Sequence, residues 1–324
     1  MDINNCYRIE VMKRIIFFTL FFILPCFAAN TPFGLRKDVR AFVVSMHQQH
    51  QFDTHKLTAL MNDVHPLPVV VQQTAHPYEA QPWFKYYPTF ITPDRIQEGV
   101  TFWKKNNAAL TRAEKIYGVP PAMIVALIGI ESKYGKNTGA YRVLDSVSTL
   151  AFNYPPRAKF FKQQLEEFLL LCREKHLDPK TLKGSYAGAI GQPQFIPSSF
   201  RHYAIDFSND GTIDLSNNTT DVIGSIANYL YLNGWRRHEP IATKITENNT
   251  RMTSDSAIIN SMLKGANAHL DLQQGTLLKL KTKNGYEHWI IYPNFFVILT
   301  YNHSINYAMV AYELSQAIKA GNKQ

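Results

Sequence analysis

A carboxylate ends an apolar run in the segment ALIGIESKYG, residues 126–135, where Glu131 follows several large aliphatic side chains. The nearest base, Lys133, is two positions on and faces another side of a helix. A carboxylate buried without a cationic partner tends to keep its proton, so its pKa rises. Such an acid can give its proton to a leaving oxygen. The segment predicts a general acid at Glu131; the alternative is a solvated helix-end carboxylate.

A second candidate site is the segment GSYAGAIGQPQFIPSSF, residues 184–200. Its glycines and alanines let the backbone approach a ligand closely. Phe195 adds a flat apolar ring, and the uncharged hydrogen-bonding side chains are Ser185, Gln192, Gln194 and Ser198. Sugars present hydroxyls at the rim and C–H groups on their faces, so this mixture suits a carbohydrate. Aromatic residues recur in NYPPR, NYLYLNGW and TYNHSINYA, although aromatic residues are more often core than binding surface.

The third candidate is an EF-hand-like loop in DFSNDGTID, residues 206–214. Calcium loops of this kind take oxygen ligands from positions 1, 3, 5 and 7, with a glycine at position 6. Those ligand positions hold Asp206, Ser208, Asp210 and, through its carbonyl, Thr212. Position 12, where a glutamate would close the loop, is an asparagine, and the next carboxylate placed to close it is Asp221. The loop predicts structural calcium, and the alternative is a simple Asp/Asn turn.

The chain that positions these groups has 324 residues, 45% hydrophobic and 18% charged, which is typical of globular proteins. The stretch MKRIIFFTLFFILPCFAAN predicts a secretory signal over residues 1–28, with Met12 as its start and a cut after Ala28. Lipid attachment at Cys26 is the less favoured alternative. Cutting there leaves Cys172 alone, so no internal disulfide is possible in the mature chain. We expect a periplasmic protein held together by its core.

The formal net charge of +9 limits the class of partner. Nucleic acid is not expected outside the cytoplasm, and no basic run is interleaved with aromatic residues. An anionic polymer of the cell envelope fits both charge and compartment. We expect a monomer without an organic cofactor.

Most of the chain shows helical patterning. Helices are predicted at 35–62, 93–118, 120–135, 157–175, 221–234 and 303–319, with an irregular connection at 71–83. From about residue 240 the period changes to two, and TLLKLKTKNGYEHWIIY predicts a hairpin around Asn284 and Gly285. We therefore expect an α+β, predominantly helical fold.

Six blocks in order resemble the lytic murein transglycosylase B family: GVPPAMIVALIGIESKYG, LDSVSTLAFNYPPR, KGSYAGAIGQPQFIPSSF, YAIDFSNDGTIDL, IGSIANYLYLNGW and LTYNHSINYA. The resemblance runs from about Pro82 to about Ala320. It implies a lysozyme-like core with a flanking helical part, a small inserted β part and an EF-hand-like calcium site. We divide the chain into the signal at 1–28, a helical and lysozyme-like core at 29–239 with the calcium loop at 206–221, a β-rich part at 240–299, and a C-terminal helix at 300–324 that returns to the core.

The resemblance also implies an activity. The family cleaves the MurNAc–GlcNAc bond of peptidoglycan glycan strands without water and leaves a 1,6-anhydromuramoyl end. Glu131 matches its single catalytic acid/base. Positions matching its groove are Tyr86, Arg157, Ser185, Gln194, Phe195, Tyr229, Tyr301, Asn302 and Tyr307. The sequence gives no preference between endo and exo cleavage and names no partner protein.

The chain departs from the family pattern at three places. Gln192 and Pro193 stand where an aromatic residue and a glycine are usual, Pro156 replaces a common arginine, and the calcium loop reaches Asp221 one residue late. Two alternatives stay open. A hydrolytic muramidase would need a second carboxylate opposite Glu131, and the matching blocks offer no clear candidate; the position of Asp145 is that of a helix cap or structural residue. A non-catalytic peptidoglycan-binding protein would gain nothing from a buried acid.

Overall fold

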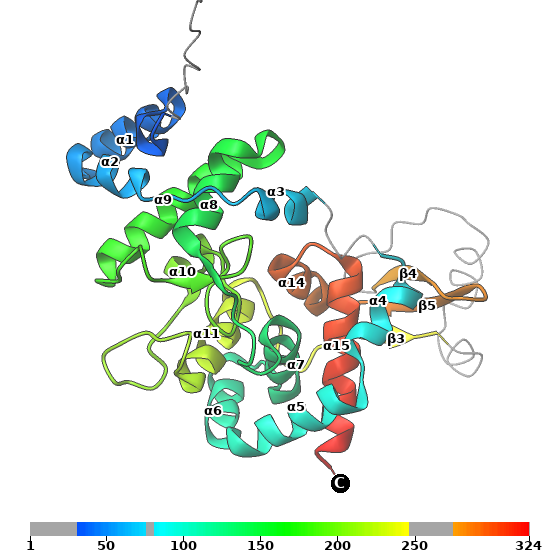
Figure 1. Ribbon diagram of the computed structural model, residues 1–324. Helices are drawn as coiled ribbons and strands as arrows, with labels where there is room; N and C mark the ends of the chain where they lie inside the picture. The colour runs from blue at the N-terminus through cyan, green and yellow to red at the C-terminus, as the bar shows by residue number, and fades with distance from the viewer. Residues whose placement is uncertain (1–30, 76–80, 246–274, 324) are drawn as a thin grey trace, which may run out of the picture.

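The computed structural model describes residues 31–75, 81–245 and 275–323, and these residues are mainly helical (Figure 1). The helices of the first half are α1 (Lys37–His50), α2 (Thr54–Asn62), α3 (Pro68–Ala75), α4 (Trp83–Phe90), α5 (Pro93–Lys105), α6 (Asn107–Tyr117) and α7 (Pro121–Ser132), after a short 3-10 turn, η1 (Phe33–Leu35). They are followed by α8 (Val143–Asn153), η3 (Pro155–Arg157), α9 (Ala158–Glu174), α10 (Pro197–Tyr203), α11 (Thr219–Leu232), α14 (Pro293–Tyr301) and α15 (Ile305–Gly321). The predictions for 157–175, 221–234 and 303–319 are confirmed by α9, α11 and α15.

Two predicted helices are each broken in two. The 35–62 helix breaks where Gln51 adopts a left-handed conformation with φ of 58° and the Asp53 side chain caps α2 by accepting from the Lys56 N–H. The 93–118 helix breaks at Asn106, whose side chain donates to the Phe102 carbonyl at 2.9 Å and so satisfies the end of α5. In both cases a short polar side chain takes over a backbone hydrogen bond at the break.

The central helix α7 is apolar on all sides and almost wholly buried. It begins with Pro121 at its first position, because the missing N–H of proline costs nothing there. It ends at Ser132, three residues before the predicted stop at Gly135. Lys133, Tyr134 and Gly135 all have positive φ, of 49°, 58° and 84°, so the chain turns sharply directly after Glu131.

The β structure forms two small sheets. β4 (Thr276–Lys281) and β5 (Tyr286–Ile291) form the predicted hairpin, with Lys281 paired to Tyr286, and β3 (Ala242–Lys244) adds to the other edge of β5. β1 (Tyr141–Arg142) pairs antiparallel with β2 (Lys183–Gly184) beside α8. Helix α14 begins inside the stretch assigned to the β-rich part. Residues 246–274 of that stretch lie outside the described residues, as do 1–30, 76–80 and 324.

The C-terminal helix α15 packs against α4, α5, α7 and α14 (Figure 1). The predicted irregular connection at 71–83 is wrong at its start, since α3 extends to Ala75. Within the described ranges no single helix has the length and apolar character to cross a membrane, whereas α6 and α7, bent by 116°, pass that test as a pair.

Candidate active site

Glu131 lies in the last turn of α7, where that helix crosses α5. The crossing is close because Gly129 on α7 and Gly99 on α5 both face the ring of Tyr134. A Cβ added at either glycine would lie 2.6 Å from the Tyr134 hydroxyl oxygen. That hydroxyl donates to the Arg95 carbonyl at 2.7 Å. Tyr134 therefore holds the sharp turn after Glu131 against α5.

The carboxyl group of Glu131 accepts a hydrogen bond from a buried phenol. The Tyr307 hydroxyl on α15 donates to Glu131 Oε1 at 2.5 Å, across 176 positions of sequence. Tyr307 is only 2% exposed, whereas Glu131 is partly exposed. Burial, and next the nearby negative charge of Glu131, raise the pKa of Tyr307 well above its usual value, so the phenol stays a hydrogen-bond donor. This hydrogen bond fixes the position of one oxygen of the Glu131 carboxyl group.

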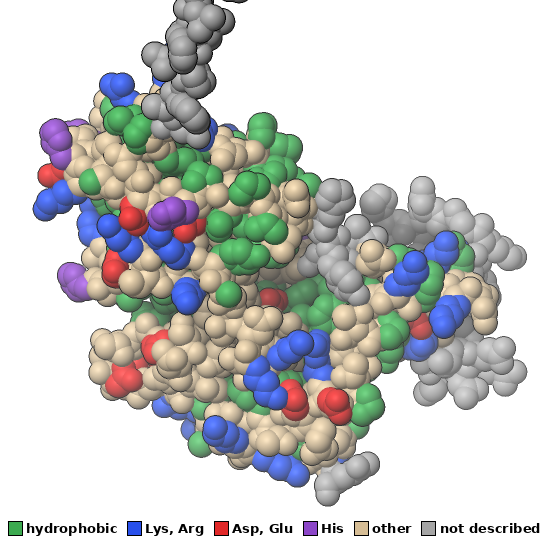
Figure 2. Space-filling model, in the orientation of Figure 1, with side chains coloured by type: hydrophobic (Ala, Val, Ile, Leu, Met, Phe, Trp, Pro, Cys, Tyr) green, Lys and Arg blue, Asp and Glu red, His purple; other side chains and the backbone are tan. Residues whose placement is uncertain are grey.

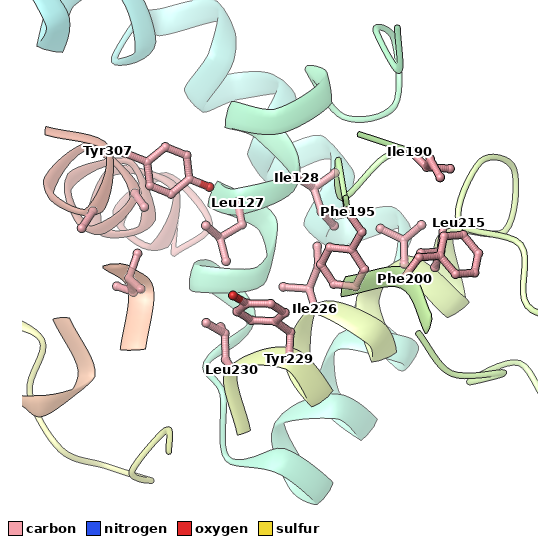
Figure 3. Packing of buried hydrophobic residues seen from close by; sticks show 14 of the residues in the cluster. Leu127, Ile128, Ile190, Phe195, Phe200, Leu215, Ile226, Tyr229, Leu230 and Tyr307 are labelled. Carbon is pink, nitrogen blue, oxygen red and sulfur yellow. The ribbon is translucent and has the colours of Figure 1, made fainter. Parts of the chain in front are cut away.

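Tyr307 is the first of four neighbouring aromatic rings. We call these four rings the aromatic row: Tyr307, Tyr301, Tyr229 and Phe195. Tyr301 stacks on Tyr307 with centroids 6.4 Å apart and an interplanar angle of 10°. Tyr229 lies 4.9 Å from Tyr301 and 5.6 Å from Phe195. Figure 3 shows the Tyr307 and Phe195 rings on opposite sides of Leu127 and Ile128 of α7, with the Tyr229 ring below these two residues. Residues from α11, α14, α15 and the 190–195 segment therefore converge beside Glu131.

The 190–195 segment is tied to three other parts of the chain. Gln194, with φ of 50°, donates from Nε2 to the Thr138 carbonyl at 3.1 Å, in the loop that follows Glu131. The Tyr301 hydroxyl donates to the Pro193 carbonyl at 2.6 Å. Gln192 is buried, and its Nε2 donates to the Ser216 carbonyl at 3.1 Å, in the predicted calcium loop. The unusual Gln192–Pro193 pair thus serves as a junction between the candidate calcium loop and the neighbourhood of Glu131.

The other predicted groove residues lie in varied settings. Ser185 Oγ accepts from the Ala189 N–H at 3.0 Å and so stabilises the glycine-rich turn. Tyr86 is 1% exposed, and its nearness contributes to the raised pKa of Tyr307. Asn302 ends α14, and its Oδ1 accepts from the Ser304 N–H. Arg157 is exposed and stacks on Phe160 at 4.3 Å, so its described contacts do not join it to the aromatic row.

The predicted calcium loop brings several oxygen atoms together. Ser208 Oγ lies 3.1 Å from Asp206 Oδ1, and Asn218 Nδ2 reaches both Ser208 Oγ, at 3.0 Å, and Asp210 Oδ2, at 3.2 Å. Hydrogen bonds from the Thr212 side chain and backbone lower the pKa of Asp210. In Asp206 the N–H groups of the loop outweigh desolvation and also lower the pKa. Two ionised carboxylates and a hydroxyl fit the preference of calcium for oxygen ligands.

Asp221 has a different setting from the other predicted ligands. It is fully buried, its Oδ1 accepts from the N–H groups of Phe207 and Ser208, both at 2.9 Å, and its Oδ2 accepts from Asp214 N at 3.1 Å. Asp221 therefore closes the loop through the backbone. The described residues contain no group of three or more His, Cys, Asp or Glu side chains arranged for a metal, so calcium at this loop stays a prediction.

Sequence reasoning missed Tyr134, Tyr203 and Asn218. The Tyr203 ring lies 4.4 Å from Tyr229, beside the aromatic row. A signal for Tyr134 was present, since a glycine inside a helical pattern often has a packing reason. The matching glycine on α5 is 30 positions earlier in the sequence, so the pair could not be recognised without the fold.

Comparison with known proteins identifies the class. Residues 34–316 match the model of the Transglycosylase SLT domain family. The membrane-bound lytic murein transglycosylase B of Escherichia coli K12 is 38% identical over 313 residues, covering 91% of this chain and 85% of that protein. The chain therefore belongs to the Transglycosylase SLT domain family, and the resemblance to lytic murein transglycosylase B is confirmed.

Two solved structures extend the likeness to the fold. The soluble lytic transglycosylase SltB1 of Pseudomonas aeruginosa is 41% identical, with a TM-score of 0.78 over 89% of this chain and 100% of that one. The Escherichia coli lytic transglycosylase Slt35 in complex with calcium is 37% identical, with a TM-score of 0.78 over 91% and 95%. The chain is thus a lytic transglycosylase that acts on peptidoglycan, and the predicted fold class, mainly helical with a lysozyme-like core, is confirmed.

Proposed function

We propose that the chain cleaves the β-1,4 bond between MurNAc and GlcNAc without water and leaves 1,6-anhydromuramoyl ends, with Glu131 as the single acid/base. The observation that carries the proposal is the hydrogen bond from buried Tyr307 to Glu131 Oε1. It orients one carboxyl group at the end of a buried helix, beside aromatic rings and amide groups suited to sugars. Glycosidases that use water or a protein nucleophile need two carboxyl groups, whereas an internal nucleophile needs one.

In this mechanism the proton of Glu131 passes to the glycosidic oxygen as its bond to C1 breaks. The C6 hydroxyl of MurNAc then attacks C1, and its proton returns to the Glu131 carboxylate, which restores the acid. Tyr307 holds Oε1, so the other carboxyl oxygen is the one assigned to proton transfer. The C6 hydroxyl competes with water because it belongs to the same sugar and is held close to C1.

Asp145, the residue considered as the second carboxylate of a hydrolase, is held by contacts within the fold. Asp145 is 5% exposed, its Oδ1 accepts from the His65 N–H at 3.0 Å, and Arg142 lies 3.5 Å from its Oδ2. These contacts give Asp145 a structural role, in which it holds His65 and Arg142. These contacts favour the transglycosylase over the hydrolytic muramidase.

Product analysis tests the proposal. Peptidoglycan sacculi digested in ¹⁸O water should yield muropeptides lighter by one water than hydrolytic products, with no label at C1. The Glu131→Gln variant should fold normally and lose at least the roughly 10²–10⁴-fold that acid–base catalysis contributes. Label at C1 would identify a hydrolase, and binding without cleavage by the unaltered chain would identify a non-catalytic peptidoglycan-binding protein.

For substrate contact we propose Tyr86, Arg157, Ser185, Gln194, Phe195, Tyr229, Tyr301, Asn302 and Tyr307. The aromatic row supports this assignment most strongly. Arg157 would act at the periphery, because its described contacts are local. We also propose that the protein works in the periplasm, where its polymer lies, with the signal predicted at residues 1–28 as support.

We propose structural calcium bound by Asp206, Ser208, Asp210 and the Thr212 carbonyl, with Asp221 closing the loop. Support comes from the convergent oxygen atoms and from the calcium complex of Slt35. Because calcium would bind only the native loop, a concentration of 100 times Kd adds about 2.7 kcal/mol to the free energy of unfolding. Thermal melts in excess calcium and in chelator should therefore differ for the unaltered chain and coincide for Asp206→Asn. Equal melting temperatures for the unaltered chain would contradict the calcium site.

A further inference from the structure

A cleft of about 460 Å³ adjoins the aromatic row at Tyr229. Its lining consists of Glu167 from α9, Tyr229 from α11, and Ser198, Ser199, Arg201, His202 and Tyr203 from α10. Tyr229 belongs to both the row and the cleft, so the two features are adjacent. In the space-filling view the surface is hollowed between the part of the molecule that holds α8 and α9 and the part that holds α6 and α11 (Figure 2). The volume lies within the range of small-molecule binding sites.

One wall of the cleft is an aromatic stack. The partly buried Tyr203 ring lies 4.4 Å from the Tyr229 ring and 4.7 Å from the exposed His202 ring. Asn228 Nδ2 donates to the Tyr203 carbonyl at 2.9 Å, which fixes α10 against α11 at this point. The cleft therefore has a rigid apolar face next to the row.

The remaining residues that line the cleft are polar, and the positive charge of Arg201 is neutralised by carboxylates. Arg201 is paired with Glu167 and, at 2.7 Å, with Glu174. The hydroxyls of Ser198 and Ser199 have no hydrogen-bond partner among the residues that the structure describes. Paired charges leave little attraction for a charged stem peptide, whereas hydroxyl groups beside an aromatic face suit an uncharged sugar.

We propose that this cleft is a distal saccharide subsite that takes an N-acetylhexosamine unit of the glycan strand. Tyr203 would pack against the C–H face of the sugar, and Ser198, Ser199 and His202 would bind its hydroxyl and acetamido groups. The inference rests on the proposed function, because it extends the glycan path beyond Tyr229. It predicts that affinity rises with strand length until a sugar reaches Tyr203.

The test uses the full chain with Glu131→Gln, so that strands bind without being cleaved, and probes it with amidase-stripped glycan strands of increasing length. Binding should tighten with length, and Tyr203→Ala or His202→Ala in this background should remove the gain, weakening long strands roughly fivefold and leaving short ones unchanged. Tyr231→Ala is the matched control, because Tyr231 is an exposed tyrosine of α11 that contacts Tyr117 outside the cleft. In the active enzyme the two cleft variants should raise KM for long strands at unchanged kcat.

Three results would overturn the subsite. Equal weakening at every length by Tyr203→Ala and His202→Ala would show only a structural role. Weakening confined to strands that carry stem peptides would show that the cleft binds peptide. No binding at any length by the Glu131→Gln chain would overturn this subsite together with the proposed glycan path, whereas the ¹⁸O experiment tests the reaction independently.

Discussion

The hydrogen bond between Tyr307 and Glu131 gives the sharpest test of how the fold supports the chemistry. Tyr307→Phe keeps the ring, which is 2% exposed, and removes only the hydroxyl that donates to Oε1 at 2.5 Å. The carboxylate gains negative charge as it transfers its proton, and the phenol stabilises that charge. The variant should therefore lose catalytic rate while its fold is largely retained.

The size of the loss follows from the type of hydrogen bond. A hydrogen bond to a charged group contributes about 1.5–3 kcal/mol. Since about 1.4 kcal/mol corresponds to tenfold in rate, kcat should fall by about 10-fold to about 150-fold. Because the hydroxyl is aimed at Glu131, the loss should appear in kcat rather than in KM.

The assay compares initial rates of muropeptide release and thermal melts for two matched variants. Tyr229→Phe removes the same group from the same aromatic row, but its hydroxyl donates to the Thr300 carbonyl at 2.6 Å and not to Glu131. It should lose about 1 kcal/mol of unfolding free energy, the usual contribution of one hydrogen bond, with kcat within a few-fold of the unaltered chain. Equal reductions of kcat in the two variants would refute the view that Tyr307 acts through Glu131.

Two further changes probe the surroundings. Gly129→Ala places a Cβ 2.6 Å from the Tyr134 hydroxyl and should lower the free energy of unfolding by about 1–3 kcal/mol. It should also lower kcat; denaturant melts and initial rates measure the two effects. Unchanged stability would show that Tyr134 can move without cost. Burial raises the pKa of Glu313 above its ordinary 4.5, and Glu287 adds to that rise against the opposing effect of Lys244, so the folded state loses stability as pH rises above 4.5. Glu313→Gln should therefore melt higher than the unaltered chain at pH 7 and equally below pH 4.5, and a gap independent of pH would contradict the assignment.

The features that sequence reasoning reached are those determined locally. Glu131 was proposed as the acid because an apolar run and its terminal charge lie together in sequence, and that role stays a prediction. The hairpin was predicted correctly because Asn284 and Gly285 specify a turn. Helix α8 was missed although Val143, Leu144, Val147 and Leu150 recur at helical spacing, so its signal was present in the sequence. Helix α14 was absorbed into the β-rich part because a short apolar run reads equally as strand, although Pro293 at its first position was a helix signal.

The parts of the site that were not predicted depend on contacts between distant segments. The contact of Tyr134 with Gly99 and the contact of Tyr203 with Tyr229 join segments that are distant in sequence. The aromatic residues of the row were proposed one by one, from resemblance, and the structure brings Phe195, Tyr229, Tyr301 and Tyr307 into a single row. The division of the chain at 28, 239 and 299 stays a prediction.

The junction at the 190–195 segment bears on how the site comes into existence during folding. The Tyr301–Pro193 hydrogen bond spans 108 positions and the Tyr307–Glu131 bond spans 176, so both close large loops of chain. Closing such loops costs entropy before the contacts form, and contacts between distant positions slow folding. Helices such as α7 and α9 can form early from their own sequence. The Glu131 carboxyl group becomes oriented only when α15 packs against α7, because Tyr307 lies on α15. No continuous fragment that lacks α15 contains the assembled site. During folding of this chain, helix content should therefore appear before catalytic activity.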